Sequence, residues 1–427
     1  MKRLLALLFL YALSSQAQTV HQLSDPVKCP SGARHFYSLT NQFSLQGKMV
    51  YECLNGNLAS YPIVGPDFKE LLADGVKAAT GTESSYGEVQ WSQVGEFLYG
   101  RDGSCGIWKF DPFAKSKTLV VRFPSPRCDQ LSVGPNDRLL VHMKDASFNL
   151  IAVGTFENGK VSQIAVSAPF DQAEWTQGNK ASFIYNRHPA RFYTPDLTTA
   201  VQQDDNHGHS GYFGKFKVSV KNDTLPNGGV GQIGCAGVTP WIPEHALYDE
   251  TTGKRVLTFG CQWAASSPEQ RSMVHFSRSL KDGVWFGTGA WITRFEYDGT
   301  KVTAIPLTET KSNFSCGYWA QPRGASDSTG TRVMFDSTRL GGCQTHVFVA
   351  VLDGVTPVPS PTPLPTPVPP SNSPVIAITC PVSSVSSLRC SADVSKLPRG
   401  DVTMEVVLRD KDGKVVATGK SAVVKLY

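Results

Sequence analysis

The stretch Gln46-Gly47-Lys48-Met49-Val50-Tyr51 begins with turn residues and continues into an apolar run typical of a β-strand. The early copies of this pattern lie roughly 40 to 50 residues apart, which is the period of a propeller blade. We therefore predict an all-β fold made of repeated antiparallel units. The copies are Val94-Gly95-Glu96-Phe97-Leu98-Tyr99, Thr252-Gly253-Lys254-Arg255-Val256-Leu257 and Thr329-Gly330-Thr331-Arg332-Val333-Met334, with looser ones at Pro135-Asn136-Asp137-Arg138-Leu139-Leu140 and Gln177-Gly178-Asn179-Lys180-Ala181-Ser182.

A second repeat supports the first. Cys105-Gly106-Ile107-Trp108 and Cys316-Gly317-Tyr318-Trp319 share a C-G-x-W pattern, and no stretch of the chain shows a convincing helical period. The count of units gives about seven blades, with six and eight as alternatives, and a closed ring would leave only short sheet edges. The predicted units begin near His35, Tyr86, Asp129, Ala173, Asn206, Glu244 and Tyr318.

The N-terminus has the pattern of a secretory signal peptide. Met1-Lys2-Arg3 is basic, residues 4–13 are apolar, and Ser15-Gln16-Ala17 fits a cleavage site. We predict that residues 1–17 are removed and that the protein is secreted to the extracellular space or the periplasm. A later apolar run long enough to span a bilayer is missing from the sequence.

Export permits disulfides, and the ten cysteines are spaced as neighbouring pairs. Metal binding by these cysteines is the alternative, and the lack of any C-x-x-C pair argues against it. We predict local bridges, each within one structural unit: Cys29–Cys53, Cys105–Cys128, Cys235–Cys261, Cys316–Cys343 and Cys380–Cys390.

The C-terminal part of the chain divides from the rest at a proline-rich stretch. Proline recurs at nearly every second position between Thr356 and Pro370, which favours an extended spacer without a core. We predict a propeller at residues 18–354, a linker at 355–374 and a small, immunoglobulin-like β-sandwich at 375–427. Within the sandwich, residues 402–408 and 414–418 read as a hairpin around a turn that ends at Gly413.

The candidate site centres on Asn206-His207-Gly208-His209. Residues two apart on a regular strand face the same way, so His207 and His209 are candidates to share a metal ion or to divide ligand and base roles. Loop histidines that only form hydrogen bonds are the alternative. By chain order, His245 is the nearest further ligand.

Other polar residues precede the equivalent predicted strands. We predict that Gln321 is a fourth metal ligand and that Arg323 supplies a fixed positive charge for an anionic substrate. Tyr212 is an alternative to a histidine as the base. The alternative is that Gln321 and Arg323 are structural and form hydrogen bonds to backbone groups.

The segment from Gln321 to Ser337 resembles the repeat of TolB-like propellers, which oligogalacturonate lyases share. Those lyases are seven-bladed and bind a divalent metal through a glutamine and histidines, two of them in an Asn-His-x-His run. Asn206-His207-Gly208-His209 is similar to that run, whereas Gln203 lies one residue further away than the lyase glutamine would. The resemblance implies calcium or manganese as cofactor and no other bound cofactor.

These observations lead to competing functional hypotheses. The first is a polysaccharide lyase of uronate-containing polymers, and the second is a non-catalytic propeller that binds glycan or protein at the cell surface. A purely structural scaffold is the third. The net charge of +5 is scattered rather than concentrated in a basic run, so nucleic acid is not an expected partner. We expect a monomer without a transmembrane segment that contacts polysaccharide or another cell-surface component.

Overall fold

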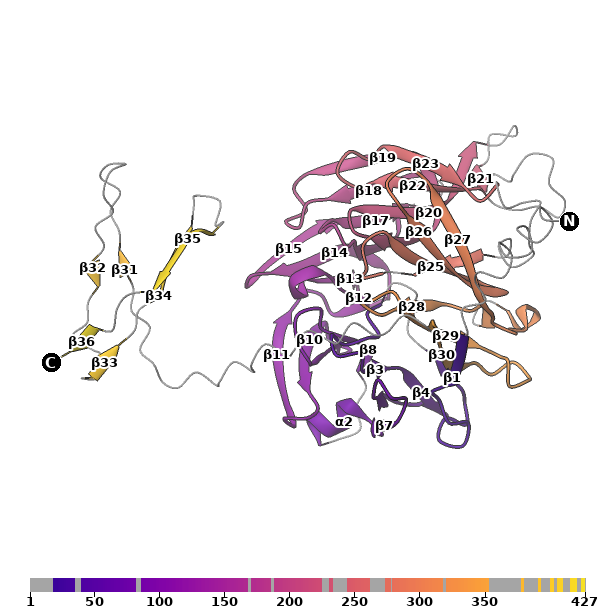
Figure 1. Ribbon diagram of the computed structural model, residues 1–427, viewed down its shortest axis with the longest axis horizontal. Helices are drawn as coiled ribbons and strands as arrows, with labels where there is room; N and C mark the ends of the chain where they lie inside the picture. Colours follow the sequence, from indigo (N-terminus) through magenta and orange to yellow (C-terminus); the bar gives the residue numbers. More distant parts are fainter. Residues whose placement is uncertain are drawn as a thin grey trace, which may run out of the picture. The chain divides into compact units, whose positions relative to one another are not determined.

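The computed structural model divides the chain into two compact units, Met1–Ser360 and Pro361–Tyr427 (Figure 1). The described residues are 18–34, 40–81, 86–167, 170–185, 188–224, 230–232, 244–261, 273–277, 279–317 and 320–352, together with the strands of the second unit. Side chains within 205–209, 220–232 and 273–275 are outside this description. Within the described ranges, no helix is long and apolar enough to cross a membrane.

The first unit is nearly all-β and is a chain of small antiparallel sheets. Two three-stranded sheets come first: β2 (Ala33–Arg34), β4 (Glu52–Asn55) and β5 (Leu58–Ser60), then β3 (Met49–Val50), β6 (Ile63–Val64) and β7 (Glu70–Leu72). A short helix, α2 (Gly75–Thr80), follows β7. It is too short to produce the apolar periodicity by which the sequence would predict a helix.

Three regular sheets are formed by strands that pair in chain order. The hairpin connections follow from the turn residues between apolar runs. The first is β8 (Gly87–Trp91), β9 (Leu98–Arg101), β10 (Gly106–Asp111) and β11 (Ser116–Arg122); the second is β12 (Arg127–Val133), β13 (Leu139–Lys144), β14 (Leu150–Glu157) and β15 (Lys160–Ala165); the third is β24 (Met273–Phe276), β25 (Val284–Gly289), β26 (Trp291–Tyr297) and β27 (Val302–Glu309).

A larger sheet lies between the second and third of these in chain order. It runs β16 (Phe170–Trp175), β17 (Ala181–Tyr185), β18 (His188–Tyr193), β19 (Ala200–Phe213), β20 (Phe216–Thr224), β22 (His245–Asp249) and β23 (Arg255–Phe259), and β21 (Val230–Gln232) also pairs with β20. Its length comes from β19, which is long enough to pair with β18 through its first half and with β20 through its second.

The last sheet of the first unit joins the two ends of that unit. It contains β28 (Gly324–Ser326), β29 (Arg332–Ser337) and β30 (His346–Leu352), and its fourth strand is β1 (Gln18–Gln22) from the beginning of the chain. Gln18 pairs with Leu352 and Gln22 with Phe348. Figure 1 shows the indigo β1 beside the orange β30. This pairing is the closure expected of a propeller, because it covers an edge that would otherwise stay open.

The repeated sequence pattern marks tight turns, as predicted. Each of the six copies leads into a strand that begins within the copy: β3, β9, β23, β29, β13 and β17. Gly47, Gly253 and Gly330 have φ of +73°, +72° and +67°. This left-handed region is strained for residues with a Cβ, which explains why glycine stands at these positions.

The core lies between successive sheets, where aromatic side chains stack. Trp285 of β25 is fully buried and stacks on Phe213 of β19 at 4.5 Å and on Phe295 of β26 at 5.3 Å between ring centroids. Buried clusters of this kind recur along the first unit and fix each sheet against the next.

Three of the predicted disulfides are confirmed. Cys29–Cys53, Cys105–Cys128 and Cys316–Cys343 have Cα–Cα separations of 5.1, 4.8 and 5.3 Å. Cys261 is also disulfide-bonded, whereas its predicted partner Cys235 and the predicted pair Cys380–Cys390 lie outside the described residues.

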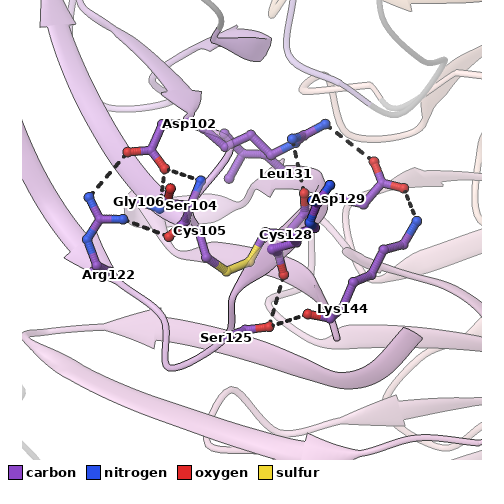
Figure 2. Close-up of a disulfide and its surroundings, with 12 residues drawn as sticks. Asp102, Ser104, Cys105, Gly106, Arg122, Ser125, Cys128, Asp129, Leu131 and Lys144 are labelled. Carbon is purple, nitrogen blue, oxygen red and sulfur yellow. Dashed lines mark hydrogen bonds and ion pairs between the residues drawn. A yellow bond between two sulfur atoms is a disulfide. The ribbon is translucent and has the colours of Figure 1, made fainter. Parts of the chain in front are cut away.

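The Cys105–Cys128 bridge joins two neighbouring sheets, so the prediction that each bridge stays within one unit is wrong here. Ionic contacts surround the bridge (Figure 2). On one side Asp102 accepts hydrogen bonds from the backbone of Ser104 and Gly106, each at 2.8 Å, and pairs with Arg122 at 3.3 Å. Asp129, which follows Cys128, pairs with Lys144 at 2.7 Å. The bridge therefore lies in a locally well-connected part of the fold.

The second unit contains three described strand pairs. They are β31 (Ile378–Thr379) with β32 (Ser391–Ala392), β33 (Gly400–Val402) with β36 (Val424–Leu426), and β34 (Glu405–Arg409) with β35 (Val415–Lys420). The last pair is the hairpin predicted from the sequence. The proline-rich linker lies outside the described residues, and the sandwich remains a prediction.

Candidate functional site

The Asn206–His209 run lies where β19 passes from one set of partners to the next. Asn206 pairs with Pro189 of β18 on one side and with Asn222 of β20 on the other. Beyond this point β19 pairs with β20 and packs beside β24 of the following sheet. The backbone therefore places the run inside β19, at the point where its pairing passes from β18 to β20 within one sheet.

The pairing of β19 with β20 is irregular at this run. His207 is opposite Lys221 and Ser210 is opposite Ser219, so the register shifts between His207 and Ser210, the interval that contains His209. The same-face argument for His207 and His209 assumes a strand without such a bulge. The side chains of both histidines lie outside the description, and their shared metal site remains a prediction.

His245, the predicted third ligand, is the first residue of β22. It pairs with Val220 of β20, so only one strand separates it from β19. Its side chain is fully buried, with ring centroids 5.4 Å from Phe259 and 5.0 Å from Phe276. Burial lowers the pKa of the imidazole to about 3, so the ring is neutral at physiological pH.

Neutral imidazole is the form that binds metals, and neither ring nitrogen of His245 has a hydrogen-bond partner within the described structure. The two phenylalanine contacts nevertheless account for the ring as an aromatic core residue. The metal and catalytic roles of His245 therefore remain predictions that require the ring to become accessible to solvent.

The remaining predicted site residues are largely buried. Tyr212 of β19 is fully buried, and Arg323 directly before β28 is 1% exposed. Gln321 is partly exposed and lies in the loop that precedes Arg323. Among the residues that the structure describes, no group of three or more His, Cys, Asp or Glu side chains is arranged to hold a metal ion.

A cavity that the sequence did not predict lies against the first two sheets and the start of β8. Its volume is about 1040 Å³. Its lining includes the Cys29–Cys53 disulfide, three tyrosines and several charged side chains: Lys28, Tyr51, Glu52, Tyr61, Glu70, Asp74, Lys77, Tyr86 and Arg101. These residues share no motif or spacing, because tertiary packing alone brings them together.

Ion pairs and hydrogen bonds hold the walls of this cavity. Lys28 contacts both carboxylate oxygens of Glu70, at 2.9 and 3.0 Å, and Arg34 pairs with Glu52 at 2.5 Å. The Tyr61 hydroxyl donates to the Tyr86 carbonyl oxygen. The cavity is thus a built feature of the fold rather than a gap between loose side chains.

Asp74 and Arg101 are further charged groups at the cavity. Asp74 accepts hydrogen bonds from the backbone of Val76 and Lys77 at the start of α2, yet desolvation holds its pKa above the usual range. Arg101 pairs with Glu88 at 3.2 Å and with Asp129 at 3.3 Å. Its guanidinium charge is therefore compensated from outside the cavity lining.

No protein-family model matches the sequence. No curated protein matches it significantly either. Solved structures do resemble the fold. A manganese complex of an oligogalacturonate lyase is 9% identical, with a TM-score of 0.57, and the match covers 80% of this chain and 95% of the lyase. An oligogalacturonate lyase from Vibrio parahaemolyticus is 10% identical, with a TM-score of 0.55 and the same two coverages. At such identities the similarity concerns the fold alone, and it supports a β-propeller fold.

Proposed function

We propose that this protein is an exported, seven-bladed propeller that acts on or binds polysaccharide. Export is supported by the N-terminal sequence and by disulfides that are compatible with an extracellular or periplasmic location. The blade count is supported by the succession of small sheets and by the pairing of β1 with β30. In this proposal the second unit is a sandwich-like module carried on the proline-rich linker.

The observation that carries the proposal is the position of Asn206-His207-Gly208-His209 in the fold. The run lies where β19 changes partners, in a fold similar to that of oligogalacturonate lyases. One of these lyases was solved as a manganese complex, which supports a divalent metal as the ligand at this position. A divalent metal, calcium or manganese, would be held by His207 and His209.

The lyase form of the proposal requires a positive charge at the uronate carboxylate and a base for the adjacent carbon. Neutralising the carboxylate acidifies the α proton and stabilises the charge that develops as the proton leaves. A histidine near neutral pH suits the role of base. We assign the central role to His207 and His209, because Tyr212, His245 and Arg323 are buried.

A second candidate function is binding without catalysis, to a glycan or a protein at the cell surface. The burial of Tyr212, His245 and Arg323 favours it, since buried groups cannot meet a polymer without rearrangement. In this alternative the residues at the propeller mouth would contact the ligand without chemical change. Both candidate functions place the site at the same position of the same fold. Only the lyase would require a divalent metal and release an unsaturated product.

We expect the double variant His207→Ala, His209→Ala to remain folded, to lose bound Mn²⁺ or Ca²⁺, and to lose cleavage of uronate polymers. Metal content by elemental analysis and absorbance of the unsaturated product measure these effects. His188→Ala, an exposed histidine on neighbouring β18, is the matched control.

Unchanged cleavage in the double variant would place the site elsewhere. Retention of the wild type on immobilised polysaccharide, with neither metal nor cleavage across a panel of uronate polymers, would replace the lyase by the binding propeller. Absence of both cleavage and retention would refute the proposed function.

A further inference from the structure

The cavity beside the first two sheets is separate from the histidine run on β19 and has the dimensions of a ligand site. Its volume of about 1040 Å³ is at the upper end of the roughly 300–1,000 Å³ typical of small-molecule sites. It is therefore large enough for several linked rings. The lining comes from the segment before β2, from β4, β5 and β7, and from the start of β8 and the end of β9.

The walls are fixed before any ligand binds. The Cys29–Cys53 disulfide ties the segment before β2 to β4. The Lys28–Glu70 ion pair ties the same segment to β7, and the Tyr51 hydroxyl donates to the Leu23 carbonyl oxygen at 3.2 Å. A preformed wall lowers the ordering cost of binding.

The carboxylates at the cavity are already compensated within the protein. Glu70 is paired with Lys28, Glu52 with Arg34, and Asp74 with the two backbone N–H groups at the start of α2. An anionic ligand such as a uronate would have to displace one of these carboxylates from its partner or to pair with the exposed Lys77. Carboxylates in ion pairs retain lone pairs, so a neutral hydroxyl can still donate to them without breaking the pair.

The lining of the cavity also contains aromatic residues. Tyr51 and Tyr61 are buried and form part of the wall, whereas Tyr86 is partly exposed. The Tyr86 ring is held edge-on by Phe110 at 4.8 Å and by Trp108 at 6.3 Å between centroids. A supported, partly exposed ring offers an apolar face with a polar edge, which suits the alternating C–H and hydroxyl surface of a sugar.

Exposed neutral groups lie beside these walls. Asn55 and Asn57 line the cavity between β4 and β5, and both are exposed. An amide side chain offers donors and an acceptor together, as hydroxyl groups require of a partner. Ser60 adds a hydroxyl to the same lining.

We propose that this cavity binds a short neutral oligosaccharide, through stacking on Tyr86 and hydrogen bonds to Asn57 and to the paired carboxylates. This site is distinct from the histidine run and requires neither a metal nor a uronate carboxylate. It gives the protein a glycan contact whether or not the β19 site is catalytic.

Calorimetric titration of the full chain with glucose-, mannose- and xylose-based oligosaccharides tests the proposal, with oligogalacturonate as the charged comparison. We expect at least one neutral oligosaccharide to bind, with a Kd that changes little between about 0.05 and about 0.5 M salt. Tyr86→Ala should weaken this binding by about tenfold. Asn57→Ala is a second variant at an exposed position, and it should weaken binding several-fold while leaving the fold intact.

The control Phe113→Ala removes an exposed aromatic ring outside the cavity lining and should leave the Kd unchanged. The variant His207→Ala, His209→Ala should also bind the neutral oligosaccharide normally, which separates this site from the proposed lyase site. Absence of binding to every neutral oligosaccharide would overturn the inference. So would salt-sensitive binding of oligogalacturonate alone, or equal weakening by Phe113→Ala and Tyr86→Ala.

Discussion

Gly253→Ala is expected to lower the free energy of unfolding of the first unit by about 3 kcal/mol, since the strain of a left-handed backbone adds to a steric clash. Gly253 has φ of +72°. A Cβ at this position would lie 2.0 Å from the carbonyl oxygen of Gln202 and 2.8 Å from its carbonyl carbon, both backbone atoms of β19. Neither atom can move without disturbing the strand.

The turn at Gly253 also holds β19 in place. The Asp204 backbone N–H donates to the Gly253 carbonyl oxygen at 2.9 Å, and the Asp204 carboxylate accepts from the Arg255 backbone N–H at 2.9 Å. A shift of the turn would therefore disturb β19 only a few residues before the Asn206–His209 run. Chemical denaturation followed by tryptophan fluorescence measures the loss of stability.

Gly56→Ala is the matched control for this substitution. Gly56 has φ of +59°, and nothing lies within 4 Å of a Cβ built there. Only the backbone strain remains, so we expect a loss of about 1 kcal/mol. Equal losses of stability in the two variants would show that the close approach of the Gln202 backbone to Gly253 does not affect stability.

Glu250→Gln is expected to remove a pH dependence of the free energy of unfolding. Folding raises the pKa of the Glu250 carboxyl from 4.5 to about 7. A shift of this size corresponds to about 3 kcal/mol. Glu250 is 1% exposed, and desolvation is the main cause of the raised pKa. Lys180 and Lys215 partly oppose this effect, and Asp249 adds to it. The folded state therefore prefers the protonated carboxyl.

The direction of the effect follows from this preference. Between about pH 4.5 and about pH 7 the folded protein holds more protons at Glu250 than the unfolded chain does, so stability falls as the pH rises. The stabilisation by the protonated Glu250 carboxyl is fully present below the pKa that Glu250 has in the unfolded chain. It is lost above about pH 7. Unfolding midpoints of the wild type and of Glu250→Gln across this range measure the difference.

Glu309→Gln, which changes an exposed carboxylate at the end of β27, is the control for this series and should follow the wild-type curve. A Glu250→Gln curve parallel to the wild type would mean that Glu250 is ionised in the folded state. A stability that rises with pH in this window for the wild type alone would reverse the assigned direction.

The repeating parts of the fold could be predicted from the sequence because each rests on local chemistry. The backbone conformation of the turns requires glycine at Gly47, Gly253 and Gly330. The turn-then-strand pattern is therefore visible in the sequence at each of these positions. Cysteine pairs such as Cys29–Cys53 are separated by short loops within a unit, and spacing was enough to pair them. The closure by β1 left no comparable local signal.

The candidate site was harder to predict because it depends on register and burial. The same-face argument for His207 and His209 could not anticipate the register shift before Ser210, since a bulge leaves no mark in the spacing of the residues. The burial of His245 between Phe259 and Phe276 depends on side chains from three strands. The tyrosine-lined cavity likewise exists only after the first sheets have packed together.

The pairing of β1 with β30 sets the order in which the chain can finish folding. During synthesis the residues of β1 are made before those of any other strand, yet their partners, from Phe348 to Leu352, are made only after every other sheet of the first unit. Until then β1 has no strand to join, and its edge groups must stay in water or be shielded by other factors. Contacts this distant in sequence form slowly, because a large loop must close before they yield any stabilisation. The last sheet is therefore the final one to be completed, and a nascent chain that ends before residue 346 would carry an unpaired β1 at one end and an open edge of β29 at the other.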